Sequence, residues 1–183
     1  MDNGGKKIVI IGASGHGKVV ADIACRNGYE DIAFLDDNDA LKECAGFPVI
    51  GKVCEAENIF CDNVVAIGNA AIRKSIQNRL VNVVTLVHHD AVISRRVMIG
   101  KGTVVMARAV INSDAKIGDG CIINTCASVD HDCIISDYTH VSVGAHVAGT
   151  VTIGDGTWIG AGAVVVGNIA KKGTYIGVPA KEY

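Results

Sequence analysis

A histidine flanked by two carboxylates is the first place in this sequence where chemistry is expected. Asp130 precedes His131, and Asp132 follows it. A carboxylate bonded to one imidazole nitrogen fixes the tautomer and raises the basicity of the other nitrogen, which is what a general base needs. A lone histidine of this kind is more often a solvated surface residue, so its neighbours decide the interpretation.

Two more histidines and an amide lie close to it along the chain. His140 and His146 follow within sixteen residues, and Asn124 comes seven residues earlier. This cluster favours an acid–base site. A zinc site made of the three histidines is the alternative, but their spacing does not match the paired histidines on one strand of the gamma carbonic anhydrases, so no metal is expected.

These residues belong to a repeat of period six that runs from Val87 to Ala170. Fourteen consecutive hexads begin with Val or Ile, and most have a small fifth residue. A helix of about 3.6 residues per turn cannot keep this period, whereas a parallel β-helix with three short strands per triangular coil does. β-Branched residues suit the buried side of such strands. His88-His89-Asp90 enters the first coil and is interpreted as a structural junction turn.

The repeat also predicts which side chains are neighbours. Three hexads make one coil, so residue n lies beside residue n+18, roughly 4.8 Å away on the next coil. This spacing pairs His131 with Gly149. A backbone N–H beside a basic histidine can stabilise a developing oxyanion.

The residues before the repeat alternate strands and helices. Strands are predicted at 7–11, 32–35 and 64–67, helices at 18–27 and 70–80, and a loop or edge segment at 47–51. The alternation indicates a small parallel α/β unit, about half of a doubly wound fold. We expect the boundary between two domains at 82/83 and an extended tail at 174–181.

A glycine-rich turn, Gly12 to Gly17, joins the first strand to the first helix. Backbone N–H groups at a helix start favour phosphate, and Asp36, at the end of the second strand, is where an acid holds a ribose or a base. The spacing is GxxGxG rather than GxGxxG, which favours a nucleotide phosphate over a dinucleotide. A tight turn without a ligand is the alternative. His16 is either a polar helix-start residue or a phosphate or sugar contact.

The composition argues against several classes of partner and location. The 183 residues carry a formal net charge of −2, which gives no electrostatic case for nucleic acid or an anionic membrane. No apolar run is long enough to cross a membrane, and the N-terminus has no signal-peptide pattern. Seven scattered cysteines without a CxxC pair suggest reduced thiols, so a cytoplasmic location is expected.

Short motifs are distributed over nearly the full length of the chain. They are Ile11 to Gly17, Phe34 to Asp37, Ala66 to Asn69 with Ile72 to Lys74, Asn124-Thr125, Thr139 to Ala145, Ala148-Gly149 and Gly177 to Lys181. In combination they resemble the bacterial sugar acyltransferases that include sialic-acid O-acetyltransferases and the UDP-4-amino-sugar N-acetyltransferases of the bacillosamine pathway.

The resemblance implies a Rossmann-like α/β half-domain followed by a left-handed parallel β-helix. It also implies a homotrimer with acetyl-CoA in the groove between adjacent solenoids. His131 would be the general base, Asp132 the acid that orients it, and Gly149 the N–H donor to the acetyl carbonyl. The implied substrate contacts are Ser14, Gly15, His16, Asp36, Asp37, Gly68, Asn69, Arg73, Asn124 and His140, and the implied coenzyme contacts are Gly144, Gly149 and Lys181.

Two features depart from the pattern of that family. Similar proteins often have Glu after the catalytic histidine, and Asp132 is one methylene shorter, so Asp130 could share its role. The last hexad also begins at Val165, about one coil earlier than is usual before the Gly-Val-Pro-Ala tail.

The function expected is acetyl transfer from acetyl-CoA to the amino group of a UDP-linked 4-amino sugar. Domain 1–82 would hold the nucleotide sugar, and domain 83–183 would hold the transfer site. No acyl-enzyme is expected, because no cysteine has an obvious activating partner. The alternatives are O-acetylation of a sialic-acid-type sugar, NAD binding by the first unit, and a non-catalytic nucleotide-sugar-binding trimer, which the shortened solenoid motivates.

Overall fold

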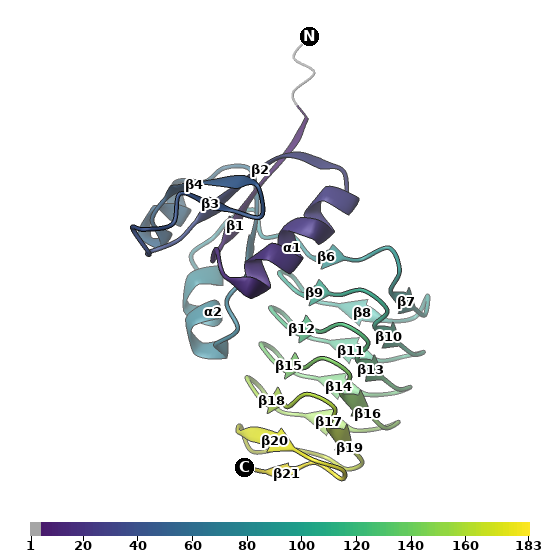
Figure 1. The fold of residues 1–183 in the computed structure, drawn as a ribbon. Helices are drawn as coiled ribbons and strands as arrows, with labels where there is room; N and C mark the ends of the chain where they lie inside the picture. The colour runs from purple at the N-terminus through teal and green to yellow at the C-terminus, as the bar shows by residue number, and fades with distance from the viewer. Residues whose placement is uncertain (1–4) are drawn as a thin grey trace. The chain divides into compact units, whose positions relative to one another are not determined.

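The chain folds into two compact units of different architecture. The computed structural model describes residues 5–183. The first unit ends at Leu86 and the second begins at Val87, while the sequence predicts this boundary at 82/83 (Figure 1). The expectation of no signal sequence rests in part on residues 1–4, which lie outside the described residues. Within the described part, no helix is long and apolar enough to cross a bilayer.

The first unit is a mainly parallel sheet with two α-helices. Its elements are β1 (Lys6–Ile11), α1 (Gly15–Arg26), β2 (Tyr29–Leu35), β3 (Glu43–Cys44), β4 (Phe47–Gly51), the 3-10 helix η1 (Val53–Asn58), β5 (Asp62–Val65) and α2 (Ala70–Gln77). The sheet order is β3-β4-β2-β1-β5, and only β3 runs antiparallel to its neighbour. This confirms the predicted parallel α/β unit. Residues 47–51 form a strand of that sheet.

Both α-helices differ from their predicted boundaries. Helix α1 begins at Gly15, three residues before the predicted start at 18. A side chain at Gly17 would collide with the Gly12 carbonyl oxygen, so glycine there lets the helix start directly against the turn. Helix α2 ends at Gln77, three residues before the predicted end at 80. His16 therefore lies in the first turn of a helix rather than in a free loop.

The second unit is a parallel β-helix of very short strands. Over the described residues 86–165 it has fourteen strands of two residues each: β6 (Leu86–Val87), β7 (Val92–Ile93), β8 (Met98–Ile99), β9 (Val104–Val105), β10 (Val110–Ile111), β11 (Lys116–Ile117), β12 (Ile122–Ile123), β13 (Ser128–Val129), β14 (Ile134–Ile135), β15 (His140–Val141), β16 (His146–Val147), β17 (Thr152–Ile153), β18 (Trp158–Ile159) and β19 (Val164–Val165). Each predicted hexad leader is the second residue of one strand. The parallel β-helix predicted from the repeat is confirmed, as is the left-handed form that the resemblance implies.

Three sheets form the sides of each coil. Their orders are β21-β20-β18-β15-β12-β9-β6, β19-β16-β13-β10-β7 and β17-β14-β11-β8. Neighbouring strands pair in parallel with partners eighteen residues apart, as Val110 with Ser128 and Ser128 with His146. The predicted n+18 neighbours are therefore real neighbours, and Figure 1 shows the strands of each sheet stacked one below another.

The interior of the coils is filled by two positions of every hexad. Leaders such as Ile123 and Val141 and small fifth residues such as Ala127 and Cys133 are buried in one continuous core. β-Branched residues pack well on a pleated surface, and small ones leave room for the chain to turn a corner. Residues between these positions point outward, and the polar residues of interest lie among them.

The last coil is followed by a hairpin. Strand β20 (Thr174–Ile176) pairs in parallel with β18, and β21 (Lys181–Glu182) pairs antiparallel with β20. The predicted extended tail is therefore a strand, a turn and a returning strand.

We predict that Gly118→Ala destabilises the solenoid by about 1–3 kcal/mol, as overpacking does. A Cβ at position 118 would lie 2.7 Å from the backbone nitrogen of Asp137 on the next coil. Thermal unfolding followed by circular dichroism measures the effect. The matched control is Gly167→Ala, where nothing lies within 4 Å of an added Cβ. Equal unfolding midpoints for the two variants would contradict the close approach of the coils.

Candidate active site

His131 lies in the turn after β13, and a carboxylate holds its ring. His131 Nδ1 is 2.8 Å from Asp132 Oδ2. The backbone N–H of His131 donates to Asp130 Oδ1 at 2.8 Å. Asp132 thus contacts the ring, whereas Asp130 contacts the backbone. With Nδ1–H donating to Asp132, the lone pair of the neutral ring is on Nε2.

The two acids make His131 a stronger base than a free imidazole. The pKa of His131 is raised, first by the hydrogen bond to Asp132 and then by the charge of Asp130. The pKa of Asp130 is lowered, chiefly by a hydrogen bond from Asn112 Nδ2 at 2.7 Å. Asp130 therefore remains ionised and contributes its charge to the site. The His131 side chain is 56% exposed, so its basic nitrogen is accessible.

Gly149 lies against the imidazole on the next coil. A Cβ added at position 149 would lie 2.7 Å from His131 Nε2, so any larger residue there would displace the ring. The Thr150 N–H donates to the His131 carbonyl oxygen at 2.9 Å and holds the two turns together. Among the described residues, none accepts a hydrogen bond from the Gly149 N–H. A basic nitrogen and a spare backbone donor therefore lie side by side.

Asn124 and His140 form a second polar group. The Thr125 N–H donates to Asn124 Oδ1 at 2.7 Å, which leaves the Asn124 amide NH₂ to face His140 Nε2 at 3.1 Å. In this orientation the Asn124 NH₂ is the donor to His140 Nε2.

The two groups lie at successive corners of one coil. Asn124 follows β12, a strand of the seven-stranded sheet, and His131 follows β13, a strand of the five-stranded sheet. The structure brings His131, Asp132 and Gly149 together and brings Asn124 and His140 together, but keeps these sets apart.

The clustered histidines do not form one metal site. His146 Nδ1 pairs with Ser128 Oγ at 2.8 Å, so His131, His140 and His146 have three different partners.

An open hollow of about 340 Å³ beside the His131 turn is lined by Asn112, Ser128, Asp130, His146, Val147, Ala148 and Val164.

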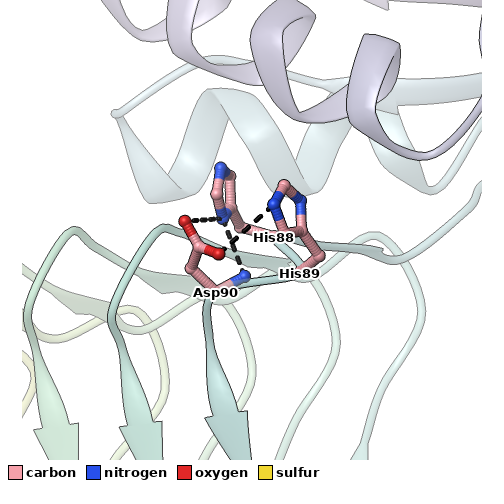
Figure 2. A group of neighbouring side chains, drawn as sticks. All are labelled: His88, His89 and Asp90. Atoms are coloured by element: carbon pink, nitrogen blue, oxygen red, sulfur yellow. Dashed lines mark hydrogen bonds and ion pairs between the residues drawn. The ribbon is translucent and has the colours of Figure 1, made fainter.

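Among the described residues, the group whose donor atoms come within 4.8 Å of one another is His88, His89 and Asp90 (Figure 2). The Asp90 N–H donates to His88 Nδ1 at 3.1 Å, and His89 Nε2 is 3.2 Å from Asp90 Oδ1. The two rings stack with centroids 4.6 Å apart. Because His88 Nδ1 already accepts a turn hydrogen bond, a cation would have to displace it, and the arrangement fits the junction turn predicted from the sequence.

In the first unit, three loops meet at the carboxyl edge of the sheet. The Ala13 N–H, in the glycine-rich turn, donates to Asp36 Oδ2 at 2.8 Å, and the Asn38 N–H donates to Asp36 Oδ1 at 2.9 Å. The Ala66 N–H, after β5, donates to the Ile11 carbonyl oxygen. Parallel strands commonly bind ligands at this edge. Asp36 joins two of the loops through its carboxylate.

His16 is a neutral histidine held under this edge. Burial, and then the charge of Arg73, lower the pKa of His16 to about 4. His16 Nε2 is buried and has no hydrogen-bond partner among the described residues. The adjacent Ser14 and Gly15 are exposed. An unpaired buried nitrogen next to an open helix start is a position that a ligand can satisfy.

Arg73 supports this edge from inside. It is 1% exposed, and its Nη1 donates to the carbonyl oxygens of Ile67 at 2.7 Å and Gly68 at 2.8 Å. Asn69 Oδ1 accepts the N–H groups of Ala71 and Ile72 and caps α2, while Gly68 and Asn69 remain exposed. Arg73 thus holds the loop that presents these two residues rather than facing solvent itself.

The remaining predicted residues lie elsewhere. Asp37 Oδ1 accepts the Val53 N–H at 3.0 Å, which directs it to the start of η1. Gly144, with a positive φ of 63°, forms the turn after β15, and its N–H donates to the Thr125 carbonyl oxygen. Lys181 is exposed on β21.

Comparison with known proteins identifies the family. Residues 7–80 match the PglD N-terminal domain, and residues 96–131 match the bacterial transferase hexapeptide repeat. The acetyltransferase domain of PglB from Neisseria gonorrhoeae is 39% identical and has a TM-score of 0.86, and the match covers 97% of this chain and 100% of that chain. The chain belongs to the PglD-type hexapeptide-repeat acyltransferases.

Two other members of this family are informative. A single-histidine variant of perosamine N-acetyltransferase from Caulobacter crescentus, in complex with CoA and GDP-perosamine, is 35% identical with a TM-score of 0.81, covering 97% of this chain and 96% of that chain. The UDP-N-acetylbacillosamine N-acetyltransferase of Bacillus subtilis is 39% identical over 112 residues, which are 56% of this chain. The match spans about half (52%) of the length of that curated relative.

Two residues that contact these groups are not among those predicted from the sequence. Asn112, which bonds Asp130, precedes it by eighteen positions, and Trp158, which stacks on His140, follows it by eighteen. The spacing of eighteen residues between neighbouring coils predicts both contacts.

We predict that Asp132→Asn lowers the pKa of His131 toward its ordinary value of 6.5, because the hydrogen bond to this carboxylate is the largest cause of the rise. Titration of the His131 ring signals by NMR measures the change. Asp130→Asn should lower the same pKa less, and the control Asp155→Asn should leave it unchanged. A His131 pKa unaltered by Asp132→Asn would show that the ring is not held as described.

Proposed function

We propose that this protein transfers the acetyl group of acetyl-CoA to the amino group of a UDP-linked 4-amino sugar. The observation that carries the proposal is the accessible Nε2 of His131, oriented through Nδ1 by Asp132 and adjacent to Gly149, whose N–H has no acceptor among the described residues. General-base catalysis needs the first feature, and stabilisation of an oxyanion needs the second.

The residues give each step a named group. His131 Nε2 takes a proton from the sugar amine as its nitrogen attacks the thioester carbon. The Gly149 N–H donates to the oxyanion of the tetrahedral intermediate. The carbon–sulfur bond then breaks. The departing coenzyme A thiolate accepts the proton that His131 took from the amine, and coenzyme A leaves as the thiol. Asp132 stabilises the imidazolium formed between these steps.

Acetyl-CoA as the donor is supported by a relative that matches over its whole length. The acetyltransferase domain of PglB from Neisseria gonorrhoeae, in complex with acetyl coenzyme A, has a TM-score of 0.87 and is covered to 100% by this chain. A solenoid as short as this one is therefore compatible with coenzyme binding. This favours an enzyme over the alternative of a nucleotide-sugar-binding trimer without catalysis.

A nucleotide in the first unit is supported by its carboxyl edge. The exposed start of α1 at Ser14 and Gly15 offers backbone N–H groups to a phosphate, and the neutral His16 offers an unpaired nitrogen. The relatives differ in their nucleotide, since one is named for a UDP sugar and another was crystallised with GDP-perosamine. We favour UDP, and a substrate panel can separate the two.

We also propose a homotrimer in which acetyl-CoA lies between neighbouring solenoids. The proposal is supported by the distribution of polar groups, because His131 and the Asn124–His140 pair are at successive corners of a coil. A corner of one subunit that faces the other corner of its neighbour would complete one site. A ring of three closes without leaving an unpaired surface.

We predict that thiol release from acetyl-CoA requires a UDP-4-amino sugar and falls about 10²–10⁴-fold in His131→Ala, the usual contribution of a general base. The assay uses the full chain with UDP- and GDP-linked amino sugars and sialic acids in parallel. His89→Ala, in the junction turn, is the matched histidine control and should keep its rate. An undiminished rate in His131→Ala would remove it from the mechanism, and acetylation of a sialic acid alone would favour O-acetyl transfer.

We predict that two inactive variants restore activity when they share a trimer. In co-expressed His131→Ala and His140→Ala chains, each mixed trimer has about one site in three with both histidines intact if each site uses two subunits. Differently tagged chains allow the mixed trimers to be purified and assayed. No activity in the mixed trimers would mean that each site lies within a single chain.

A further inference from the structure

The one tryptophan of the chain lies beside the Asn124–His140 pair. Trp158 is on β18, next to β15 in the seven-stranded sheet, and its register partner there is His140. The two rings stack with centroids 5.6 Å apart and an interplanar angle of 12°. The indole therefore covers one face of the imidazole whose Nε2 contacts Asn124.

A hydrogen bond fixes the indole in this position. Trp158 Nε1–H donates to Ser142 Oγ at 2.7 Å, and Ser142 itself is buried. The ring is thus held both by a stacked partner and by its one polar atom. Because the N–H is already used, the exposed part of the ring can offer only apolar and π contacts to a ligand.

Trp158 is nevertheless 50% exposed. The next register partner, on the side away from His140, is Thr174, a residue with a short side chain. A large aromatic surface that is ordered before any ligand arrives binds with little loss of conformational freedom. Tryptophan is also among the residues that most often dominate binding energy where they contact a partner.

The order of the residues along the seven-stranded sheet favours one kind of ligand. Asn124 follows β12, His140 lies on β15 and Trp158 lies on β18. The next strand of the sheet is β20, which belongs to the C-terminal hairpin. Exposed Lys172 and Lys181 follow in that hairpin region. A ligand with a reactive end, an apolar arm and an anionic end fits this order, and an acyl-coenzyme A has that sequence of groups.

We propose that Trp158 contacts the pantetheine arm of acetyl-CoA next to the thioester, while its stacked face keeps His140 in position. This inference rests on the proposed function, because it assumes that acetyl-CoA is the donor. It adds a ligand contact on the seven-stranded sheet, at a different corner of the coil from His131.

The test uses tryptophan fluorescence, because all indole emission from this chain comes from Trp158. Acetyl-CoA added to the full chain should change the emission saturably, with the Kd that calorimetry gives. Trp158→Ala should weaken acetyl-CoA binding about tenfold, and Trp158→Phe, which keeps a ring, by about two- to threefold. Met98→Ala, an exposed apolar residue on the four-stranded sheet, is the control and should bind as the unchanged protein does.

The outcomes separate this inference from the proposed function. Calorimetric binding without a change in emission, and with Trp158→Ala binding normally, would overturn the contact and leave the function standing. Emission already typical of a buried indole, and unresponsive to acetyl-CoA, would mean that a neighbouring subunit covers the ring and would also overturn it. No binding of acetyl-CoA by the unchanged protein would overturn both. Trp158→Phe guards against misfolding, since its small loss must lie between the values for the unchanged protein and Trp158→Ala.

Discussion

The inward packing of Val and Ile fixes everything else in the solenoid. Side chains alternate between the two faces of a strand, so a slip of one residue would turn each buried leader outward and each polar neighbour inward. Leaders such as Ile123 and Val129 are fully buried, which makes such a slip very unfavourable. Turn residues need no packing of their own to be positioned. His131 and Gly149 meet because the core around Val129 and Val147 holds their coils in register.

Two histidines show how position sets protonation. His16 is buried near a guanidinium, and both features lower its pKa. His131 is exposed between two carboxylates, and its pKa rises. At neutral pH the first is uncharged, while the second binds a proton more readily than a free imidazole. The same side chain thus has opposite pKa shifts, because only its surroundings differ.

Much of this could be predicted from the sequence, and the limit has a physical cause. The solenoid is periodic, so each neighbour is a fixed number of positions away, and Gly149 could be paired with His131 without coordinates. The α/β unit has no such rule, because its contacts depend on how a helix lies on a sheet. The resemblance predicts Arg73 as a ligand contact, and only the structure shows that its guanidinium is buried against the loop carbonyl oxygens of Ile67 and Gly68. The Asp37 carboxylate accepts the Val53 N–H, and this contact likewise depends on how the elements of the α/β unit pack.

The hairpin of β20 and β21 closes the last coil by pairing with the edge of one sheet. An end that is capped in this way does not depend on how many coils precede it, since each coil contacts only its neighbours. Solenoid length can therefore change by whole coils of eighteen residues while every side chain keeps its face. A change of six residues would instead rotate all later turns to a different side of the triangle. Insertions and deletions between β13 and β16 would separate His131 from Gly149. Beyond β18, an insertion or deletion of eighteen residues would leave this pair unchanged.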